Sequence, residues 1–147
     1  GAKPKRNVAL ALCVAMHPAH VLVVEDEPEI AELIRYHLAR AGHRVSTAAN
    51  GWEAIATARG DRPALMILDR MLPDLDGFGV CEILRREPAT ATIPIVIVSA
   101  WASGDSRHLG LELGALDYVT KPFSPAELVE RVQRLLAARD GGPARTD

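Results

Sequence analysis

The sequence predicts a single α/β domain in which helices cover both faces of a parallel β-sheet. Short apolar runs typical of buried strands alternate five times with segments of helical periodicity. The chain has 147 residues, enough for one hydrophobic core of ordinary size. Strict alternation favours right-handed crossovers and a doubly wound sheet, because neighbouring parallel strands need such connections.

The first half of the chain supplies two strands and two helices. Residues 21–24 are apolar throughout, as expected for a strand that is buried on both faces of a sheet. Pro28 suits the first turn of a helix, where its missing N–H costs nothing, and Gly42 ends that helix. A second strand is expected at residues 43–48 and a second helix at residues 52–59.

The second half continues the alternation and closes with a well-marked helix. We expect strands and helices in turn at residues 65–68, 77–86, 95–98, about 105–113 and 116–119. Ser124-Pro-Ala-Glu127 then forms a capping box with proline at the first helical position. This motif predicts a final helix directly after Ser124.

Composition and charge narrow the function. A net charge of −2 gives no electrostatic footprint for nucleic acid or an anionic membrane, so we expect no direct binding to either. Cys13 and Cys81 form neither a CxxC motif nor a Cys/His cluster, which argues against structural zinc and a disulfide scaffold. These features favour a protein of the reducing cytoplasm.

The two ends of the chain differ from the alternating segment. Residues 8–16 form an apolar run that is too short to span a bilayer, and we expect residues 1–19 to be an N-terminal extension or tag remnant. Residues 140–147 have the composition of a linker, and we expect them to lead to a missing output domain. The predicted domain therefore covers residues 20–139.

Polar side chains collect where the apolar strands end. Glu25 and Asp26 follow the first strand, and Asp69 follows the third. Ser99 and Lys121 follow the fourth and fifth strands. Ligands of such sheets bind beyond the carboxyl ends of the strands, where the strand order reverses. Each residue alone is an ordinary cap or turn residue, but their coincidence at one edge predicts a site.

These residue types suit metal-assisted phosphoryl transfer. Clustered carboxylates repel one another, and a divalent hard cation such as Mg²⁺ relieves that repulsion through oxygen ligands. Asp26, Asp69 and a backbone carbonyl just after Asp69 are candidate ligands. A carboxylate nucleophile can form an acyl phosphate. Lys121 can balance charge on the phosphoryl oxygens, and Ser99 can donate a hydrogen bond to one of them.

Four segments carry a resemblance to a known family: Val21-Leu-Val-Val-Glu-Asp-Glu-Pro28, Ile67-Leu-Asp-Arg-Met-Leu-Pro-Asp-Leu-Asp-Gly77, Val98-Ser-Ala100 and Asp117-Tyr-Val-Thr-Lys-Pro-Phe123. Their combination and spacing resemble the receiver domains of bacterial response regulators in two-component signalling, over residues of about 20–139. The resemblance implies a flavodoxin-like, five-stranded parallel sheet of order 2-1-3-4-5 with five flanking helices.

The resemblance also implies how the acidic residues act. Asp69 is the phosphoacceptor, and a sensor histidine kinase is the donor. Asp26 and Asp69 bind Mg²⁺ together with the backbone carbonyl of Met71, while Glu25 acts largely through water. Such a domain assists its own phosphorylation and dephosphorylation, but it is not a turnover enzyme.

Three further residues receive roles from the same resemblance. Lys121 binds the phosphoryl group, and Ser99 is the switch hydroxyl. Tyr118 is the aromatic residue that changes rotamer on activation. Phosphorylation is thereby expected to alter the surface that the domain presents to a partner.

The resemblance extends to a possible dimer face on the fourth helix, fifth strand and fifth helix. The charged residues that resemble this face in OmpR/PhoB-type regulators, which carry a DNA-binding output domain, are Arg107, Glu112, Asp117, Glu127 and Arg131. Arg107 with Glu127, and Asp117 with Arg131, would pair across a homodimer formed on phosphorylation. The alternative is a solvated face whose pairs lie within one chain. Gln133 stands where a basic partner for Glu112 is expected.

Two other functions fit part of the pattern. A phosphatase of the haloacid-dehalogenase type also uses an aspartate nucleophile with Mg²⁺, but it needs a second aspartate where this chain has Met71. An interaction module that has lost its switch would lack Asp69, Ser99 or Lys121, and this chain has all of them.

Three residues depart from the family pattern without removing a reactive group. Arg70 directly follows the phosphoacceptor, Trp101 stands two residues beyond Ser99, and Leu116 precedes Asp117. These departures bear on the lifetime of the phosphoryl group and on access to it.

Overall fold

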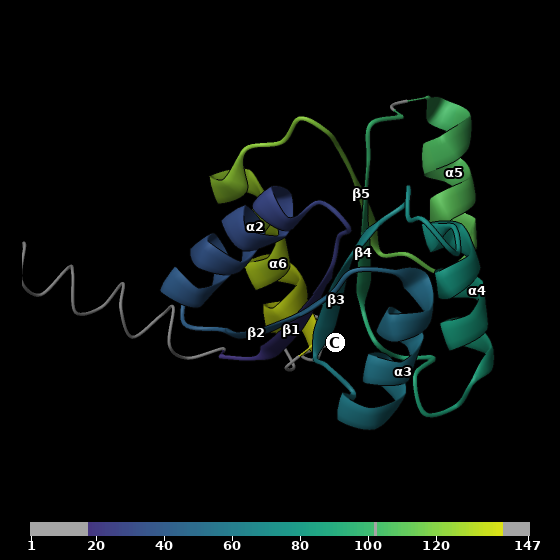
Figure 1. The fold of residues 1–147 in the computed structure, drawn as a ribbon, viewed down its shortest axis with the longest axis horizontal. Coiled ribbons are helices and arrows are strands. Elements are labelled where there is room, and N and C mark those ends of the chain that lie inside the picture. The colour runs from purple at the N-terminus through teal and green to yellow at the C-terminus, as the bar shows by residue number, and fades with distance from the viewer. Residues whose placement is uncertain (1–17, 102, 140–147) are drawn as a thin grey trace, which may run out of the picture.

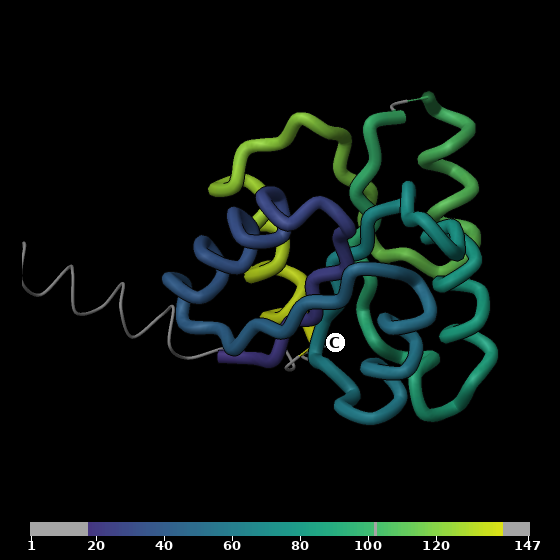
Figure 2. Tube along the Cα trace, viewed as in Figure 1, coloured from purple at the N-terminus to yellow at the C-terminus, as the bar shows by residue number. Residues whose placement is uncertain are grey.

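The computed structural model describes residues 18–101 and 103–139. All strands of its sheet are parallel and lie in the order β2-β1-β3-β4-β5, as predicted (Figure 1). Followed along the chain in Figure 2, the path leaves β1 for the edge strand β2 and then crosses to β3 on the other side. The strand order therefore reverses between β1 and β3. The strands are β1 His20–Val24, β2 Arg44–Ala48, β3 Leu65–Asp69, β4 Ile95–Ser99 and β5 Asp117–Thr120.

Helices cover both faces of the sheet. The pair α2 and α6 lies on one face, and α3, α4 and α5 lie on the other (Figure 1). Among the described residues, no helix is long and apolar enough to cross a membrane. The helices are α2 Pro28–Arg40, α3 Gly51–Asp61, α4 Gly77–Arg86, α5 Gly104–Glu112 and α6 Pro125–Arg139.

Each face of the sheet carries its own hydrophobic core because side chains alternate along a strand. On β1, Val21 and Val23 pack toward α2 and α6, while Leu22 and Val24 pack toward α3 and α4. All four side chains are at most 1% exposed. Burying a side chain of this kind contributes roughly 1.5–3 kcal/mol, so the central strands hold the sheet edge in a fixed geometry.

Side-chain caps fix where the helices near the site begin. Asp76 accepts a hydrogen bond from the N–H of Phe78 at the start of α4, and Ser103 accepts one from Ser106 at the start of α5. The predicted Ser124 cap accepts from the N–H of Glu127 at 3.4 Å. These caps set the lengths of the loops that follow β3, β4 and β5.

Candidate functional site

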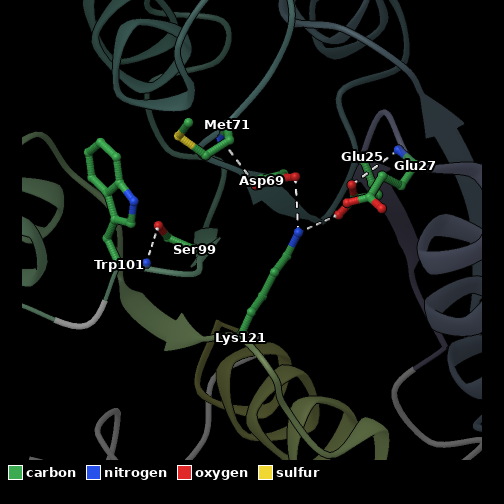
Figure 3. Close-up of polar contacts among 7 residues, drawn as sticks. All are labelled: Glu25, Glu27, Asp69, Met71, Ser99, Trp101 and Lys121. Atoms are coloured by element: carbon green, nitrogen blue, oxygen red, sulfur yellow. Dashed lines mark hydrogen bonds and ion pairs between the residues drawn. The ribbon is translucent and has the colours of Figure 1, made fainter.

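The carboxyl ends of β1, β3, β4 and β5 bring the predicted polar residues together at one edge of the sheet. Asp69 is in register with Val98 on β4, and Ser99 is in register with Thr120 on β5. Glu25 and Lys121 are the first residues beyond β1 and β5. The order of the strands thus places them around Asp69, at the reversal point between β1 and β3 (Figure 3).

Lys121 joins two buried carboxylates. Its Nζ lies 3.1 Å from Oδ2 of Asp69 and 3.1 Å from Oε1 of Glu25. Asp69 is 3% exposed and Glu25 is 4% exposed, so both carboxylates have lost most of their hydration. Figure 3 shows the lysine extending from the end of β5 to a point between them. A buried carboxylate needs such a counter-charge.

The electrostatics of the site favour a proton or a cation. Burial, followed by repulsion from Asp69, raises the pKa of Glu25 to about 7. Burial lowers the pKa of Lys121, but the attraction of Asp69 and Glu25 outweighs it, so that this pKa is raised. Lys121 is therefore charged, yet its one positive charge does not balance the surrounding carboxylates.

Three carboxylates form a group that fits a hard divalent ion. Glu25, Asp26 and Asp69 each offer an oxygen, and these oxygens lie within 4.8 Å of one another. Asp26 is exposed, whereas the other two are buried, so the group opens to solvent on one side. The backbone N–H of Met71 donates to Oδ1 of Asp69 at 3.0 Å and orients the carboxylate. An all-oxygen, strongly anionic donor set is the kind that Mg²⁺ prefers.

Ser99 is the last residue of β4 and is fully buried. Its Oγ accepts a hydrogen bond from the N–H of Trp101 at 3.0 Å, and its carbonyl accepts one from the N–H of Lys121 at 2.7 Å. Because the hydroxyl accepts in the first contact, its own proton is free to be donated. The residue therefore fits the predicted role of a switch hydroxyl.

Tyr118 points inward and is fully buried. Its hydroxyl donates to the carbonyl of Trp101 at 2.8 Å, which links β5 to the loop after β4. Arg107, which lies on α5, donates a hydrogen bond to the carbonyl of Tyr118 at 2.9 Å. The structure thus shows the inward rotamer of the predicted switch aromatic.

The predicted dimer face makes its ion pairs within one chain. Arg131 lies 2.7 Å from Asp117 and 3.6 Å from Glu127, so the interaction of Asp117 with Arg131 is intramolecular in this structure. The carboxylate of Glu112 lies 2.8 Å from His108, one turn earlier on the same helix. Oε1 of Gln133 lies 2.7 Å from Nε2 of His43, which is a buried residue. The amide of Gln133 therefore has a hydrogen-bond partner within the chain.

Asp74 has a structural role that the sequence motifs do not indicate. Its carboxylate accepts backbone hydrogen bonds from Gly51 at 2.7 Å and Trp52 at 3.0 Å. A third comes from Leu75 at 2.8 Å. These bonds tie the loop after β3 to the start of α3. The local pattern Pro-Asp-Leu-Asp-Gly signals a turn but does not reveal this distant partner.

Comparison with known proteins gives the family. A family model described as the response regulator receiver domain matches residues 21–133. The chain is 47% identical over 116 residues to the alkaline phosphatase synthesis transcriptional regulatory protein PhoP of Bacillus subtilis, covering 79% of this chain and 48% of that protein. It is 44% identical over 120 residues to the probable transcriptional regulator ycf27 of Pyropia yezoensis, and this match covers 82% of this chain and 48% of that protein. The chain therefore spans about half the length of these curated relatives.

A solved structure agrees with the sequence comparison. The receiver domain of sensor histidine kinase PA1611 from Pseudomonas aeruginosa, which has a magnesium ion in its active-site cleft, superposes with a TM-score of 0.75. The two chains are 32% identical, and the match covers 82% of this chain and 98% of that one. The prediction made from the four motifs is thereby confirmed: this chain belongs to the response regulator receiver domain family.

Proposed function

We propose that Asp69 accepts a phosphoryl group from a sensor histidine kinase and that this event switches a signalling surface. The observation that carries the proposal is the position of Lys121 Nζ between the Asp69 and Glu25 carboxylates, at the reversal point of a receiver sheet. A buried nucleophile, a cation beside it and an anionic metal-binding group are the parts that phosphoryl transfer requires.

The side chains divide the chemistry among them. A carboxylate oxygen of Asp69 attacks phosphorus, a phosphorus–oxygen bond forms, and the phosphorus–nitrogen bond to the donor histidine breaks. The imidazole leaving group takes up a proton from solvent. Lys121 stabilises charge on the transferring group, and Ser99 donates its free hydroxyl proton to a phosphoryl oxygen. Ser99 is fully buried and the side chain of Lys121 is 18% exposed, and this partial exclusion of water strengthens both interactions.

Mg²⁺ is the cofactor that the acidic group would hold. Asp26 and Asp69 are its carboxylate ligands in this proposal, the carbonyl of Met71 is a third, and Glu25 acts through water. When bound, the ion neutralises charge on the phosphoryl oxygens. Asp26 is exposed and therefore accessible to an ion that arrives from solvent.

The readout of phosphorylation is a change on the surface formed by α5, β5 and α6. Ser99 reaches Tyr118 through Trp101, whose N–H and carbonyl bond to the two side chains. A movement of Ser99 toward the phosphoryl group would therefore shift Trp101 and Tyr118 and alter the face that bears Arg107 and Arg131. We propose that this face mediates homodimerisation, that a DNA-binding output domain reads it, and that the protein acts in the cytoplasm as a phosphoacceptor rather than a turnover enzyme.

Acetyl phosphate provides a test that needs no identified kinase. Incubation with acetyl phosphate and Mg²⁺ should add the mass of one phosphoryl group to the wild type and none to Asp69→Asn. Asp76→Asn is the matched control, because Asp76 is an acid of the same loop that caps α4. Equal labelling of all three proteins would refute the proposal.

A further inference from the structure

Arg70, the residue directly after the phosphoacceptor, has its guanidinium between two aromatic rings. Its Cζ lies 4.0 Å from the centroid of the Phe78 ring and 4.6 Å from the centroid of the Trp101 ring. The first ring belongs to α4 and the second to the loop after β4. The side chain of Arg70 is 14% exposed, so these contacts are partly shielded from water. Cation–π contacts of this kind strengthen as they lose solvent.

Polar contacts fix the same guanidinium in place. Nη1 of Arg70 donates to Oγ of Ser106 in the first turn of α5 at 3.2 Å. Nε lies 3.6 Å from the carboxylate of Asp76, the residue that caps α4. Arg70 thus joins the end of β3, the start of α4 and the start of α5. We call Arg70, Phe78, Trp101 and Ser106 the arginine clamp.

The clamp holds the residue that connects the two switch side chains. The backbone of Trp101 donates to Ser99 and accepts from the Tyr118 hydroxyl, at 3.0 and 2.8 Å. Its indole is 50% exposed, and the guanidinium of Arg70 lies against it. Anything that frees the indole therefore loosens the segment that links the switch hydroxyl to the switch aromatic.

The buried ring of Tyr118 lies near Gly110 of α5, as does the ring of Phe78, the second aromatic member of the arginine clamp. A Cβ added at Gly110 would lie 3.1 Å from the Tyr118 ring and 3.3 Å from the Phe78 ring, so both rings flank this glycine of α5. The contacts therefore run from Phe78 to Arg70, from Arg70 to Trp101 and from Trp101 to Tyr118, and Gly110 lies beside the two rings at the ends of this series. Each member restricts its neighbours.

We propose that Arg70 is a positioning residue of the switch: its clamp favours the arrangement with Tyr118 buried before any phosphoryl group arrives. The inference rests on the proposed function, because it concerns which conformation receives the phosphoryl group at Asp69. Arg70 acts through Trp101 and Ser99, and its charged partner is Asp76. A receptive conformation that is more populated raises the apparent affinity for a ligand by the same factor.

Fluorescence of Trp101 tests the clamp without any phosphoryl chemistry. In a Trp52→Phe background, Trp101 is the remaining tryptophan of the chain. Arg70→Gln should make the indole more accessible to acrylamide and lower its fluorescence anisotropy. Arg70→Lys should behave like Arg70→Gln, because an ammonium keeps the charge but cannot stack as a planar group. Arg86→Gln, which removes an exposed arginine of α4, should leave Trp101 unchanged.

Binding of the phosphate mimic beryllofluoride connects the clamp to the site. With Mg²⁺ present, Arg70→Gln should bind beryllofluoride about three- to tenfold more weakly, the scale of one or two lost cation–π contacts. Its affinity for Mg²⁺ alone should equal that of the wild type, because the carboxylates are intact. In the Trp101→Leu background, Arg70→Gln should cause little further loss, since the two residues act through one contact.

The outcomes separate this inference from the proposed function. Wild-type protein that binds no beryllofluoride and accepts no phosphoryl group refutes both. Wild-type protein that binds beryllofluoride, beside an Arg70→Gln variant with unchanged quenching and unchanged affinity, refutes the clamp alone. Additive losses in the double variant would also refute it, because Arg70 would then act independently of Trp101.

Discussion

The ammonium of Lys121 lies 3.1 Å from a carboxylate oxygen of Asp69, although the two residues are separated by 52 positions in the sequence. The contact joins the ends of β5 and β3, on either side of β4. A cation already beside the nucleophile needs no rearrangement when negative charge arrives, which is how preorganised sites stabilise transferring phosphoryl groups.

Mg²⁺ binding should depend on Asp26 and Asp69 together. Removing either carboxylate leaves too few anionic oxygens to displace water from the ion. Isothermal titration should show Mg²⁺ affinity for Asp26→Ala at least roughly tenfold weaker, which corresponds to about 1.4 kcal/mol. Glu130→Ala, which removes an exposed carboxylate paired with Arg134 on α6, is the control. An unchanged affinity of Asp26→Ala would place the metal elsewhere.

The metal-free protein should lose stability as the pH rises from about 4.5 to about 7. The pKa of Glu25 is raised from 4.5 to about 7 in the folded state, so the folded protein binds more protons than the unfolded chain in this window. The free energy of unfolding then falls with rising pH. Glu25→Gln removes the titrating group and should flatten this part of the profile.

Urea unfolding in EDTA at several pH values measures this slope directly. The difference between wild type and Glu25→Gln cancels the contributions of other titrating groups. A pH dependence that is the same in both proteins would contradict the raised pKa of Glu25.

Beryllofluoride should drive dimerisation through the face of α5, β5 and α6. Since Arg131 pairs with Asp117 and Glu127 within one chain, dimerisation must exchange or share these pairs across a two-fold axis. Sedimentation at low salt should detect a dimer that weakens as salt screens the charges. Arg131→Glu should abolish it, whereas the neighbouring control Arg134→Glu should retain it. A monomer at high protein concentration with beryllofluoride bound would contradict the prediction.

Phospho-Asp69 should be long-lived, with a lifetime of many minutes or more. Hydrolysis needs a water in line with the phosphorus–oxygen bond, and the side chains of Met71 and Trp101 in the flanking loops cannot accept a hydrogen bond that would orient it strongly. Both side chains are 50% exposed, so they are available to shield the entry path. Trp101→Glu and Met71→Asn should shorten the lifetime. Intact-mass decay after EDTA addition measures it, and wild-type decay in both variants would refute shielding.

The sequence predicted the architecture because each strand and helix carries its own local signal. The apolar runs predicted the strands to within a residue or so, while Pro28 at the first helical position and the cap at Ser124 marked where α2 and α6 begin. The last strand begins at Asp117 rather than Leu116, since the residue pairing with β4 starts with Asp117 opposite Val96, although the N–H of Leu116 already donates to the carbonyl of Ile95 at 2.8 Å. Strand ends then brought Glu25 and Lys121 together, since parallel strands share one carboxyl edge.

Contacts between distant loops could not be predicted in the same way. The acceptor role of Asp74 at the start of α3 depends on the relative position of two loops, which no local pattern encodes. The stacking of Arg70 against Trp101 likewise arises only after β3 and β4 are adjacent. Arg131 lies 2.7 Å from Asp117 within one chain, and the pairing of these two residues across a homodimer stays a prediction.

Chemical trapping of the acyl phosphate tests the central claim most directly. Borohydride reduces a phosphorylated aspartate to homoserine, so the modified residue is identified by peptide sequencing in a mass spectrometer. After treatment with acetyl phosphate and Mg²⁺, homoserine should appear at position 69 and at no other aspartate, and omission of Mg²⁺ should suppress it. Homoserine at Asp26 or Asp76, with position 69 unmodified, would contradict the assignment of Asp69 as the phosphoacceptor.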